Sequence, residues 1–144
     1  MTLYQRILAL KAAGDLAGVS ALIPYTGFIG LASELDADGL VCRLEARPGN
    51  MGNTVLRAVH GGVVGALLEH TALMQLLWES EVERLPKIVN LSIDYLRPAL
   101  CDHDLLARAS VVKQGRRVAN VRVEAWQDDP ERPVAAAHGH FILG

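Results

Sequence analysis

The pattern of hydrophobic and polar positions is densest over residues 63–78, a stretch that contains no proline. Apolar side chains fall on nearly every side of a helix drawn through it, which is typical of a buried helix. The stretch is interrupted only by Glu69, His70, Thr71 and Gln75. A carboxylate within a buried helix is unfavourable unless it is paired or used in function, so Glu69 is the first residue that needs an explanation.

This apolar stretch does not have the pattern of a membrane span. Glu69 and His70 stand near its centre, where a charge costs roughly 2.5–3.5 kcal/mol on insertion scales. An export signal has a positively charged region followed by an uninterrupted apolar core, and the N-terminus does not show this pattern. We therefore expect a soluble, cytoplasmic protein that does not associate with membranes.

Upstream of the stretch, the pattern predicts a helical segment followed by a hairpin. Leucines and an isoleucine recur at roughly helical intervals and predict a helix within residues 2–22, in an N-terminal helical segment over residues 1–24. Residues 28–36 and 40–47 have the alternation of strands. The Asp-Ala-Asp-Gly turn at residues 36–39 joins them into a hairpin.

Downstream, the pattern predicts mainly strands. A loop rich in turn residues covers residues 48–53, and a polar connection covers residues 79–84. Four strand-like runs then follow, at residues 88–96, 105–113, 117–126 and 134–143. One helix that is apolar on all sides, together with about six strands, predicts an α+β fold in which an antiparallel sheet wraps around a long central helix.

Composition and charge narrow the class of protein. The 144 residues are 51% hydrophobic and 21% charged, which suits a single globular domain over residues 1–144. The formal net charge of -2 provides no electrostatic attraction for nucleic acid. Cys42 and Cys101 lie in core-like sequence without a paired cysteine or neighbouring histidine, so we expect buried free thiols in a reducing compartment.

The histidines do not predict a metal site. His70 follows Glu69 directly, but on a helix its side chain points about 100° away from that of Glu69. His138 and His140 share one face of a predicted strand. A zinc site needs three or four ligands, so we expect no bound metal.

Three motifs in order carry a resemblance to a known family. The first is the His-Gly-Gly sequence at residues 60–62, with Glu69 nine residues after the histidine. The second is the run at residues 90–99, which contains Tyr-Leu-Arg-Pro-Ala, and the third is the hairpin sequence at residues 112–119. Over residues 27–143 the chain resembles the hotdog-fold acyl-CoA thioesterases of the phenylacetate-pathway, or PaaI-like, type.

The resemblance implies a fold, a substrate and an assembly. The fold would be the hotdog fold, with its sheet around the central helix. The substrate would be an acyl-CoA, whose coenzyme A belongs to the substrate, so that no separate cofactor is needed. The assembly would be a homodimer with active sites composed from both subunits, paired further into a tetramer.

The sequence departs from the family pattern at three positions. Family members usually carry an asparagine six residues before the motif histidine, but Thr54 stands there and Asn53 lies one step away. We take both as candidate substrate-binding residues. The position seven before the motif tyrosine is often serine or threonine and is Ile88 here, and the acidic residue is Glu69 instead of the commoner aspartate. These differences concern the substrate and the mechanistic subtype.

Thioester hydrolysis needs a hydrogen-bond donor for the developing oxyanion and a base or nucleophile. Gly61 and Gly62 at the helix start offer backbone N–H groups as donors and substrate contacts, and Glu69 is the candidate base or nucleophile. His60 could orient a water or the thioester carbonyl. Structural alternatives are an ordinary glycine-rich helix start, a buried carboxylate hydrogen-bonded to the backbone or to Thr71, and a histidine that holds its loop.

The spacing of these groups predicts how they could meet. Gly61 and Glu69 are 8 residues apart, which is about 12 Å along a helix axis. A reacting carbonyl must lie within about 3–3.5 Å of the attacking atom. One chain therefore cannot easily supply both groups to one carbonyl, whereas a two-fold dimer with antiparallel central helices would place Glu69 of one subunit opposite Gly61 of the other.

Basic residues complete the prediction. Arg97, Arg116 and Arg117 are candidate contacts for the phosphates of coenzyme A, and solvated surface charge is the alternative. We predict an acyl-CoA thioesterase. The alternatives are a hotdog dehydratase or hydratase, whose signatures we do not find, and a non-catalytic acyl-CoA-binding protein, which Thr54 and Ile88 keep open.

Overall fold

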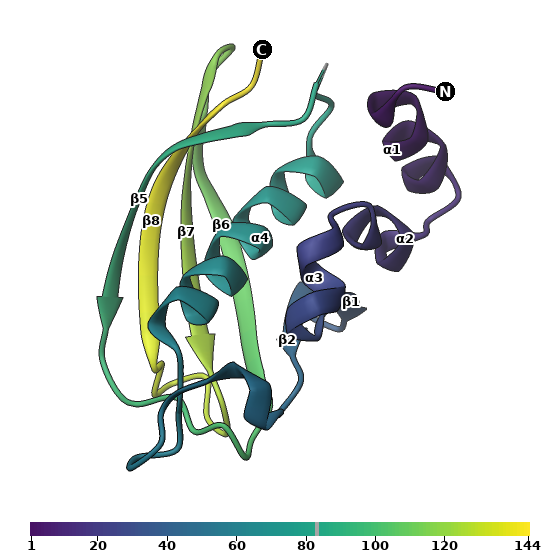
Figure 1. Cartoon of the computed structure of the whole chain (residues 1–144). Coiled ribbons are helices and arrows are strands. Elements are labelled where there is room, and N and C mark those ends of the chain that lie inside the picture. Colours follow the sequence, from purple (N-terminus) through teal and green to yellow (C-terminus); the bar gives the residue numbers. More distant parts are fainter. Residues whose placement is uncertain (83) are drawn as a thin grey trace.

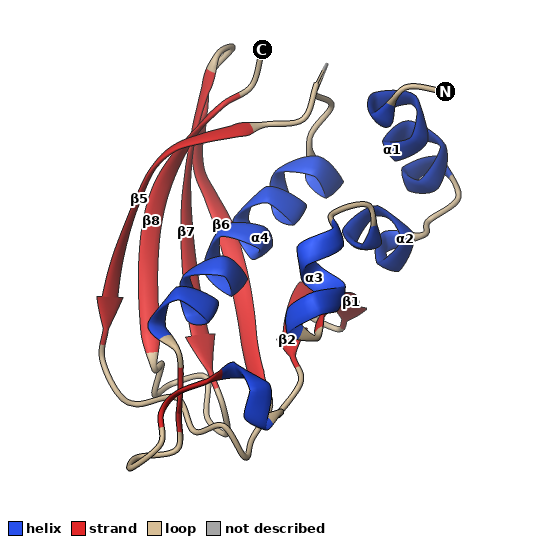
Figure 2. Ribbon diagram, viewed as in Figure 1, coloured by secondary structure: helices blue, strands red, loops and turns tan. Residues whose placement is uncertain are grey.

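The computed structural model describes residues 1–82 and 84–144. Three short helices lead into a hairpin, a small strand pair and one long helix, and four long strands follow (Figure 1, Figure 2). The helices are α1 (Leu3–Ala12), α2 (Leu16–Ala21), α3 (Pro24–Ile29), the single 3-10 turn η1 (Pro48–Asn50) and α4 (Gly61–Glu79). The strands are β1 (Leu31–Asp36), β2 (Gly39–Leu44), β3 (Met51–Asn53), β4 (Ala58–Val59), β5 (Lys87–Tyr95), β6 (Leu105–Gln114), β7 (Val118–Trp126) and β8 (Ala135–Ile142).

Six strands form one antiparallel sheet in the order β1-β2-β6-β7-β8-β5, and α4 lies across one face of it (Figure 1). Successive strand residues point to opposite faces, so alternate side chains reach the helix. In β7 these are Ala119, Val121, Val123 and Ala125, all buried. The predicted α+β class and hotdog arrangement are confirmed, and strands occur in all six predicted regions.

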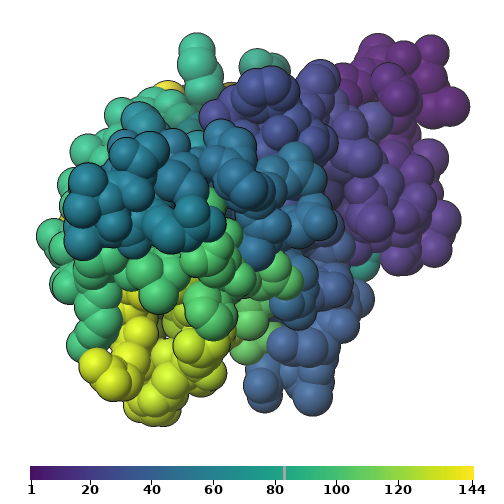
Figure 3. Space-filling model, turned by 60° about the horizontal axis from the view of Figure 1, so that its bottom comes forward, coloured from purple at the N-terminus to yellow at the C-terminus, as the bar shows by residue number. Residues whose placement is uncertain are grey.

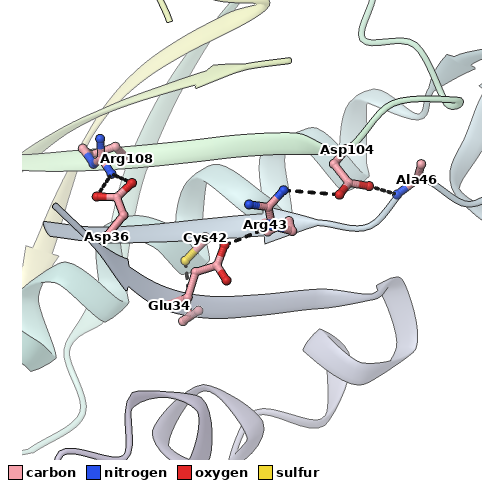
Figure 4. A network of polar contacts seen from close by, with 8 residues as sticks. Glu34, Asp36, Cys42, Arg43, Ala46, Asp104 and Arg108 are labelled. Atoms are coloured by element: carbon pink, nitrogen blue, oxygen red, sulfur yellow. Dashed lines mark hydrogen bonds and ion pairs between the residues drawn. The ribbon is translucent and has the colours of Figure 1, made fainter. Parts of the chain in front are cut away.

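On the outer face, ion pairs hold the β1–β2 hairpin to β6 (Figure 4). Arg108 of β6 donates to both carboxylate oxygens of Asp36, at 2.6 Å each. Arg43 donates to Glu34 at 3.0 Å and to Asp104 at 3.3 Å. The hydrogen bond from Arg108 lowers the pKa of Asp36. These pairs are exposed, so they align the strands more than they stabilise the fold.

The N-terminal segment is helical but not one helix, so the prediction of a single helix within residues 2–22 is wrong. Helix α1 ends at Ala12, and Gly14 takes a left-handed conformation with φ of 70°. Asp15 then caps α2 by accepting a hydrogen bond from the Gly18 N–H at 2.9 Å. A glycine that turns the chain and an aspartate that restarts it divide the segment in two.

The strand predicted over residues 28–36 is correct only from Leu31 onward. Residues 28 and 29 belong to α3, which begins with Pro24 in its first turn and ends where Gly30 adopts φ of 79°. The expected helical segment ends at this proline. A proline is equally suited to the first turn of a new helix, where its missing N–H is not needed.

Helix α4 is present and longer than predicted, but it is not buried on all sides. The sheet covers one side of it, and α2 and α3 pack on β1 beside it (Figure 2). A strip along the helix, which we call the open strip, remains uncovered or half-covered and consists of Gly62, Ala66, Glu69 and Leu73. The expectation of a buried Glu69 is therefore wrong for the single chain, in which this side chain is exposed.

The loop predicted at residues 48–53 contains η1 and β3, and β3 pairs with β4 in a small hairpin. Seen from the end of the molecule where α4 begins, this segment lies across that end, and the N-terminal helices form a lobe to one side (Figure 3). Within residues 1–82 and 84–144, no helix is long and apolar enough to cross a membrane.

Candidate active site

The start of α4 is held by its own histidine. His60 is the N-cap residue, and its Nδ1 accepts a hydrogen bond from the Gly62 N–H at 2.9 Å. Its carbonyl accepts from Val63 and Val64. Gly62 is therefore not a free donor, but the Gly61 N–H has no acceptor among the described residues. It is the free donor at the positive end of the helix.

Two residues that we did not place in the site fix this donor. The Tyr95 hydroxyl, at the end of β5, donates to the Gly61 carbonyl at 2.8 Å. The Asn50 carbonyl accepts from the His60 N–H at 2.8 Å, while the buried Asn50 amide donates to Ile29 at 2.7 Å. The Tyr-Leu-Arg-Pro-Ala motif was the available signal for Tyr95. Asn50 carried no sequence signal of its own.

The glycine at position 52 is required by a close approach. A Cβ placed there would lie 2.6 Å from the His60 Cα, which is backbone and cannot move aside. The β3–β4 hairpin therefore packs its main chain directly against the N-cap of α4, and no larger residue fits.

The other two candidates from this loop point elsewhere. The Asn53 side-chain oxygen accepts from the Val55 and Leu56 N–H groups at 3.0 Å each, so it holds its own turn. Thr54 is exposed within that turn. Neither side chain contacts His60 or Gly61 through a hydrogen bond in the described structure, and a shift that brings Asn53 to the motif position is not seen.

The three candidate arginines lie at opposite ends of α4. Arg97 lines a cavity of about 330 Å³ together with Gly61 and Tyr95, and its guanidinium donates to the Pro133 carbonyl at 2.6 Å. Arg116 and Arg117 line a different cavity, of about 890 Å³, in the turn between β6 and β7. The neighbouring Gln114 accepts from Ser80, just beyond the last residue of α4. The 19 residues of α4 separate the two ends by about 28 Å.

Glu69 stands between these ends on the open strip. It borders a cavity of about 150 Å³ between α3 and α4. Within the described structure its carboxylate has no hydrogen-bond or ion-pair partner. The structural alternative of a bond to Thr71 is wrong, because the Thr71 hydroxyl donates to the Leu67 carbonyl at 2.6 Å. Glu69 is thus a free carboxylate beside an apolar cavity.

His70, the next residue, is buried and structural. Its Nε2 lies 2.7 Å from the Ser20 hydroxyl, which accepts from Ser33, and Ser33 lies 3.2 Å from the Cys42 sulfur. Burial lowers the pKa of His70 to about 4 and raises the pKa of Cys42. The imidazole is therefore neutral near pH 7.

Other potential ligands are scattered. His138 and His140 share the outer face of β8, as predicted from the strand alternation. His140 pairs with Asn90 at 3.2 Å. Among residues 1–82 and 84–144, no group of three or more His, Cys, Asp or Glu side chains is placed to hold a metal ion.

Comparison with known proteins identifies the family. Residues 56–134 match the family model described as the thioesterase superfamily. A protein from Chromobacterium violaceum is similar in structure, with 38% identity, a TM-score of 0.79 and 97% of each chain covered. A phenylacetic acid degradation-related protein from Ralstonia eutropha JMP134 shares 28% identity, with a TM-score of 0.75 over 89% of this chain and 96% of that one.

A variant of the phenylacetic acid degradation protein PaaI from Thermus thermophilus is also similar, with 25% identity and a TM-score of 0.68. The alignment covers 84% of this chain and 99% of that one. The comparison with curated protein sequences gave no match. The match of the family model over more than half of the chain, together with these structures, places the chain in the thioesterase superfamily, as a PaaI-like hotdog thioesterase.

Proposed function

We propose that this protein is an acyl-CoA thioesterase that hydrolyses a CoA thioester to the free acid and coenzyme A, with Glu69 as its base or nucleophile. The observation that carries the proposal is the unpaired Glu69 carboxylate, exposed on the open strip beside an apolar cavity. Membership of the thioesterase superfamily supports the reaction class. A carboxylate without a structural partner is free to act on a substrate.

The chemistry needs few groups. Water attacks the thioester carbonyl carbon while Glu69 takes its proton, or Glu69 attacks directly and water then hydrolyses the anhydride. In both routes the carbonyl oxygen becomes an oxyanion, the C–S bond breaks, and the sulfur of coenzyme A leaves and is protonated. The free N–H of Gly61 is the proposed donor to that oxyanion.

The two groups would come from different subunits. Gly61 begins α4 and Glu69 lies in its middle, about 12 Å further along the axis. One thioester carbonyl therefore cannot lie within about 3–3.5 Å of both groups of the same chain. We propose a two-fold homodimer in which antiparallel α4 helices bring Glu69 of one subunit to Gly61 of the other and create two identical sites.

An unpaired sheet edge supports this assembly. Strand β5 lies at the edge of the sheet and exposes 55% of Val89, and within the described part of the chain it pairs only with β8. A long edge strand with apolar side chains is a template for pairing with another chain. Pairing of β5 with its two-fold copy would extend the sheet and cover the open strip. Further pairing to a tetramer stays a prediction.

In such a dimer, the three candidate arginines would lie at the same end of each active site. In this register Glu69 of one helix lies opposite Gly61 of the other, and α4 runs on for 10 residues beyond Glu69. The end of one α4 therefore extends about 15 Å past the start of the other. Arg116 and Arg117 of one subunit would therefore lie at the same end of the site as the partner's Gly61 and the partner's Arg97, although they lie far from Gly61 in their own chain. We propose that these guanidinium groups bind the phosphates of coenzyme A.

The direct test is a panel of acyl-CoAs that spans short, medium, long and aromatic acyl groups, with release of free thiol as the measurement. We expect thiol release by the wild-type protein and none above background by a folded Glu69→Gln variant. Binding without thiol release would identify a non-catalytic acyl-CoA-binding protein. Hydration of an enoyl-CoA without thiol release would identify a hydratase.

A mixing experiment tests the shared site. Gly61→Pro removes the backbone donor, and the first helical position tolerates proline. Gly61→Ala is the matched control, because its Cβ would lie 3.5 Å from the Tyr95 ring and its N–H is kept. When Glu69→Gln and Gly61→Pro chains are refolded together, half of the dimers are heterodimers with one intact site. Activity should return to about a quarter of wild type.

Both single variants must first be shown to fold, to dimerise and to lack activity. If one chain supplied both groups, every site in the mixture would keep a defect. A mixture that stays inactive, with heterodimers confirmed by mass spectrometry, would therefore exclude the shared site.

A further inference from the structure

The cavity beside Glu69 is built jointly by α4 and by the N-terminal segment. One wall comes from the open strip and its neighbour, through Ala66, Glu69 and His70. The opposite wall comes from the start of α3, through Ile23, Tyr25 and Thr26. This second wall lies outside residues 56–134, the part of the chain that matches the thioesterase superfamily. The size and shape of the cavity thus depend on the N-terminal segment as well as on the part of the chain that matches the family.

The buried polar groups of these walls are already engaged. The Thr26 hydroxyl donates to the Ile23 carbonyl at 2.8 Å, and the His70 Nε2 lies 2.7 Å from the Ser20 hydroxyl. Among the described residues that line the cavity, the Glu69 carboxylate and the hydroxyl of the half-exposed Tyr25 have no hydrogen-bond partner in the chain. Since a buried polar group of a ligand would need its own hydrogen bond, the engaged walls favour an apolar occupant with its reactive end at Glu69.

The cavity lies where the geometry of attack by Glu69 would place the acyl group of a substrate. The thioester carbonyl must lie within about 3–3.5 Å of the attacking oxygen, and the acyl group begins at that same carbon. The cavity is the apolar space next to Glu69 in its own chain. Its volume of about 150 Å³ matches an apolar protein cavity known to hold one benzene molecule.

We propose that this cavity receives the acyl group and that α3 sets the size of the acyl groups that the enzyme accepts, with an optimum near a six-carbon chain or a single aromatic ring. The inference rests on the proposed thioesterase function. It makes Ile23 and Tyr25 specificity-determining residues. Tyr25 is 48% exposed and stacks on Phe28 with ring centroids 5.9 Å apart, so it stands at the mouth of the cavity.

The test changes the α3 wall and measures the preference for acyl length. Straight-chain acyl-CoAs from acetyl to dodecanoyl, together with benzoyl-CoA, are compared by kcat/KM. Ile23→Ala lengthens the cavity and should raise the ratio for decanoyl-CoA over hexanoyl-CoA at least about tenfold, since a single methylene in an apolar pocket changes discrimination by about 10–200-fold. Ile23→Phe should shift the optimum toward butanoyl-CoA. Tyr25→Ala, at an exposed position, provides a second variant if Ile23 variants unfold.

The control is Leu96→Ala, which enlarges the other cavity, the one beside Gly61. Its ratio for decanoyl-CoA over hexanoyl-CoA should stay within about twofold of wild type. A shift in that ratio for Leu96→Ala, with none for the Ile23 and Tyr25 variants, would overturn the inference and assign the acyl group to the cavity beside Gly61.

Failure of the enzyme function is detected separately. Each acyl-CoA is titrated by calorimetry into Glu69→Gln protein with and without Ile23→Ala, so that no turnover is required. A shift of the tightest-binding acyl length toward longer chains supports the inference even if the wild type releases no thiol. An unchanged binding order overturns it even if the wild type is an active thioesterase.

Discussion

The two sides of α4 serve different purposes, although the residues along them look alike in sequence. On the side that faces the sheet, Leu67 and Leu68 are fully buried. On the open strip, Gly62, Ala66 and Glu69 leave the backbone accessible and present one free carboxylate. The contrast shows that a helix can be apolar almost all round and still have only one side in the core of its own chain. The other side stays open in this chain, and it is where we propose that a substrate and a partner subunit bind.

The largest expected effect comes from the open strip. Glu69→Gln keeps the shape of the side chain but removes the base, so kcat for thioester hydrolysis should fall by at least ~10²-fold. Because the carboxylate has no partner in the described structure, the melting temperature should stay close to that of wild type. Turnover within threefold of wild type in the folded variant would remove Glu69 from the mechanism.

On the side of α4 that faces the sheet, we expect a substitution to lower stability strongly. Leu67→Ala leaves a cavity between α4 and the sheet and should lower the free energy of unfolding by about 2–5 kcal/mol, measured by urea denaturation. The matched control is Leu8→Ala on the exposed side of α1, which should change it by about 0.5 kcal/mol or less. Equal losses for the two variants would mean that the side of α4 toward the sheet is not the centre of the core.

The buried side of α4 can also be tested through the pH dependence of the free energy of unfolding, because it carries His70. Its pKa is lowered to about 4 by burial, while the unfolded chain has the ordinary value. Only the unfolded state binds the proton as pH falls below the ordinary value, so the stability present above that value is lost as pH falls toward 4. Between pH 7 and 4.5 the loss should be about 2 to 3 kcal/mol.

The measurement is urea denaturation across this pH range for wild type and His70→Gln, whose amide can still bond to Ser20. The carboxylates that titrate in this range are common to both proteins, and their contribution cancels in the difference. The variant should show the smaller decline. Parallel curves for the two proteins would show that the neutral, buried imidazole does not couple stability to pH.

The smallest expected effect is at the far end of α4. Arg116→Ala should raise KM for an acyl-CoA by up to about fivefold with little change in kcat, since an exposed charge contact is worth about 0.2–1 kcal/mol and acts equally on ground and transition states. Arg122→Ala, on the outer face of the sheet, is the control and should leave KM unchanged. An equal response of the two variants would take Arg116 out of the coenzyme A site.

Long elements with a clear period were readable from the sequence. The strict alternation of β7 and the unbroken apolar stretch of α4 predicted their types, and the position of His60 before the stretch located the start of the helix. Short elements were not. Pro24 is compatible both with the end of one helix and with the start of the next, and only packing on β1 decides between them.

The site was predicted in outline but not in detail for a similar reason. A pattern that is apolar on all sides cannot tell which of two neighbours, Glu69 or His70, points inward. That choice depends on Ser20, which lies 50 residues away in sequence and supplies the hydroxyl for the imidazole. Asn50 was missed because it acts mainly through its backbone carbonyl, which every residue has.

The division of α4 into two sides limits how related sequences can change in length. Inserting one residue between Gly61 and Glu69 would turn the rest of the helix by about 100° and advance it by about 1.5 Å. The carboxylate would leave the open strip, while the stretch would remain just as apolar. Chains that vary in length can therefore do so at the hairpin tips or in the connection after α4, but a single insertion in the first half of this helix would displace both Glu69 and the buried side chains of α4.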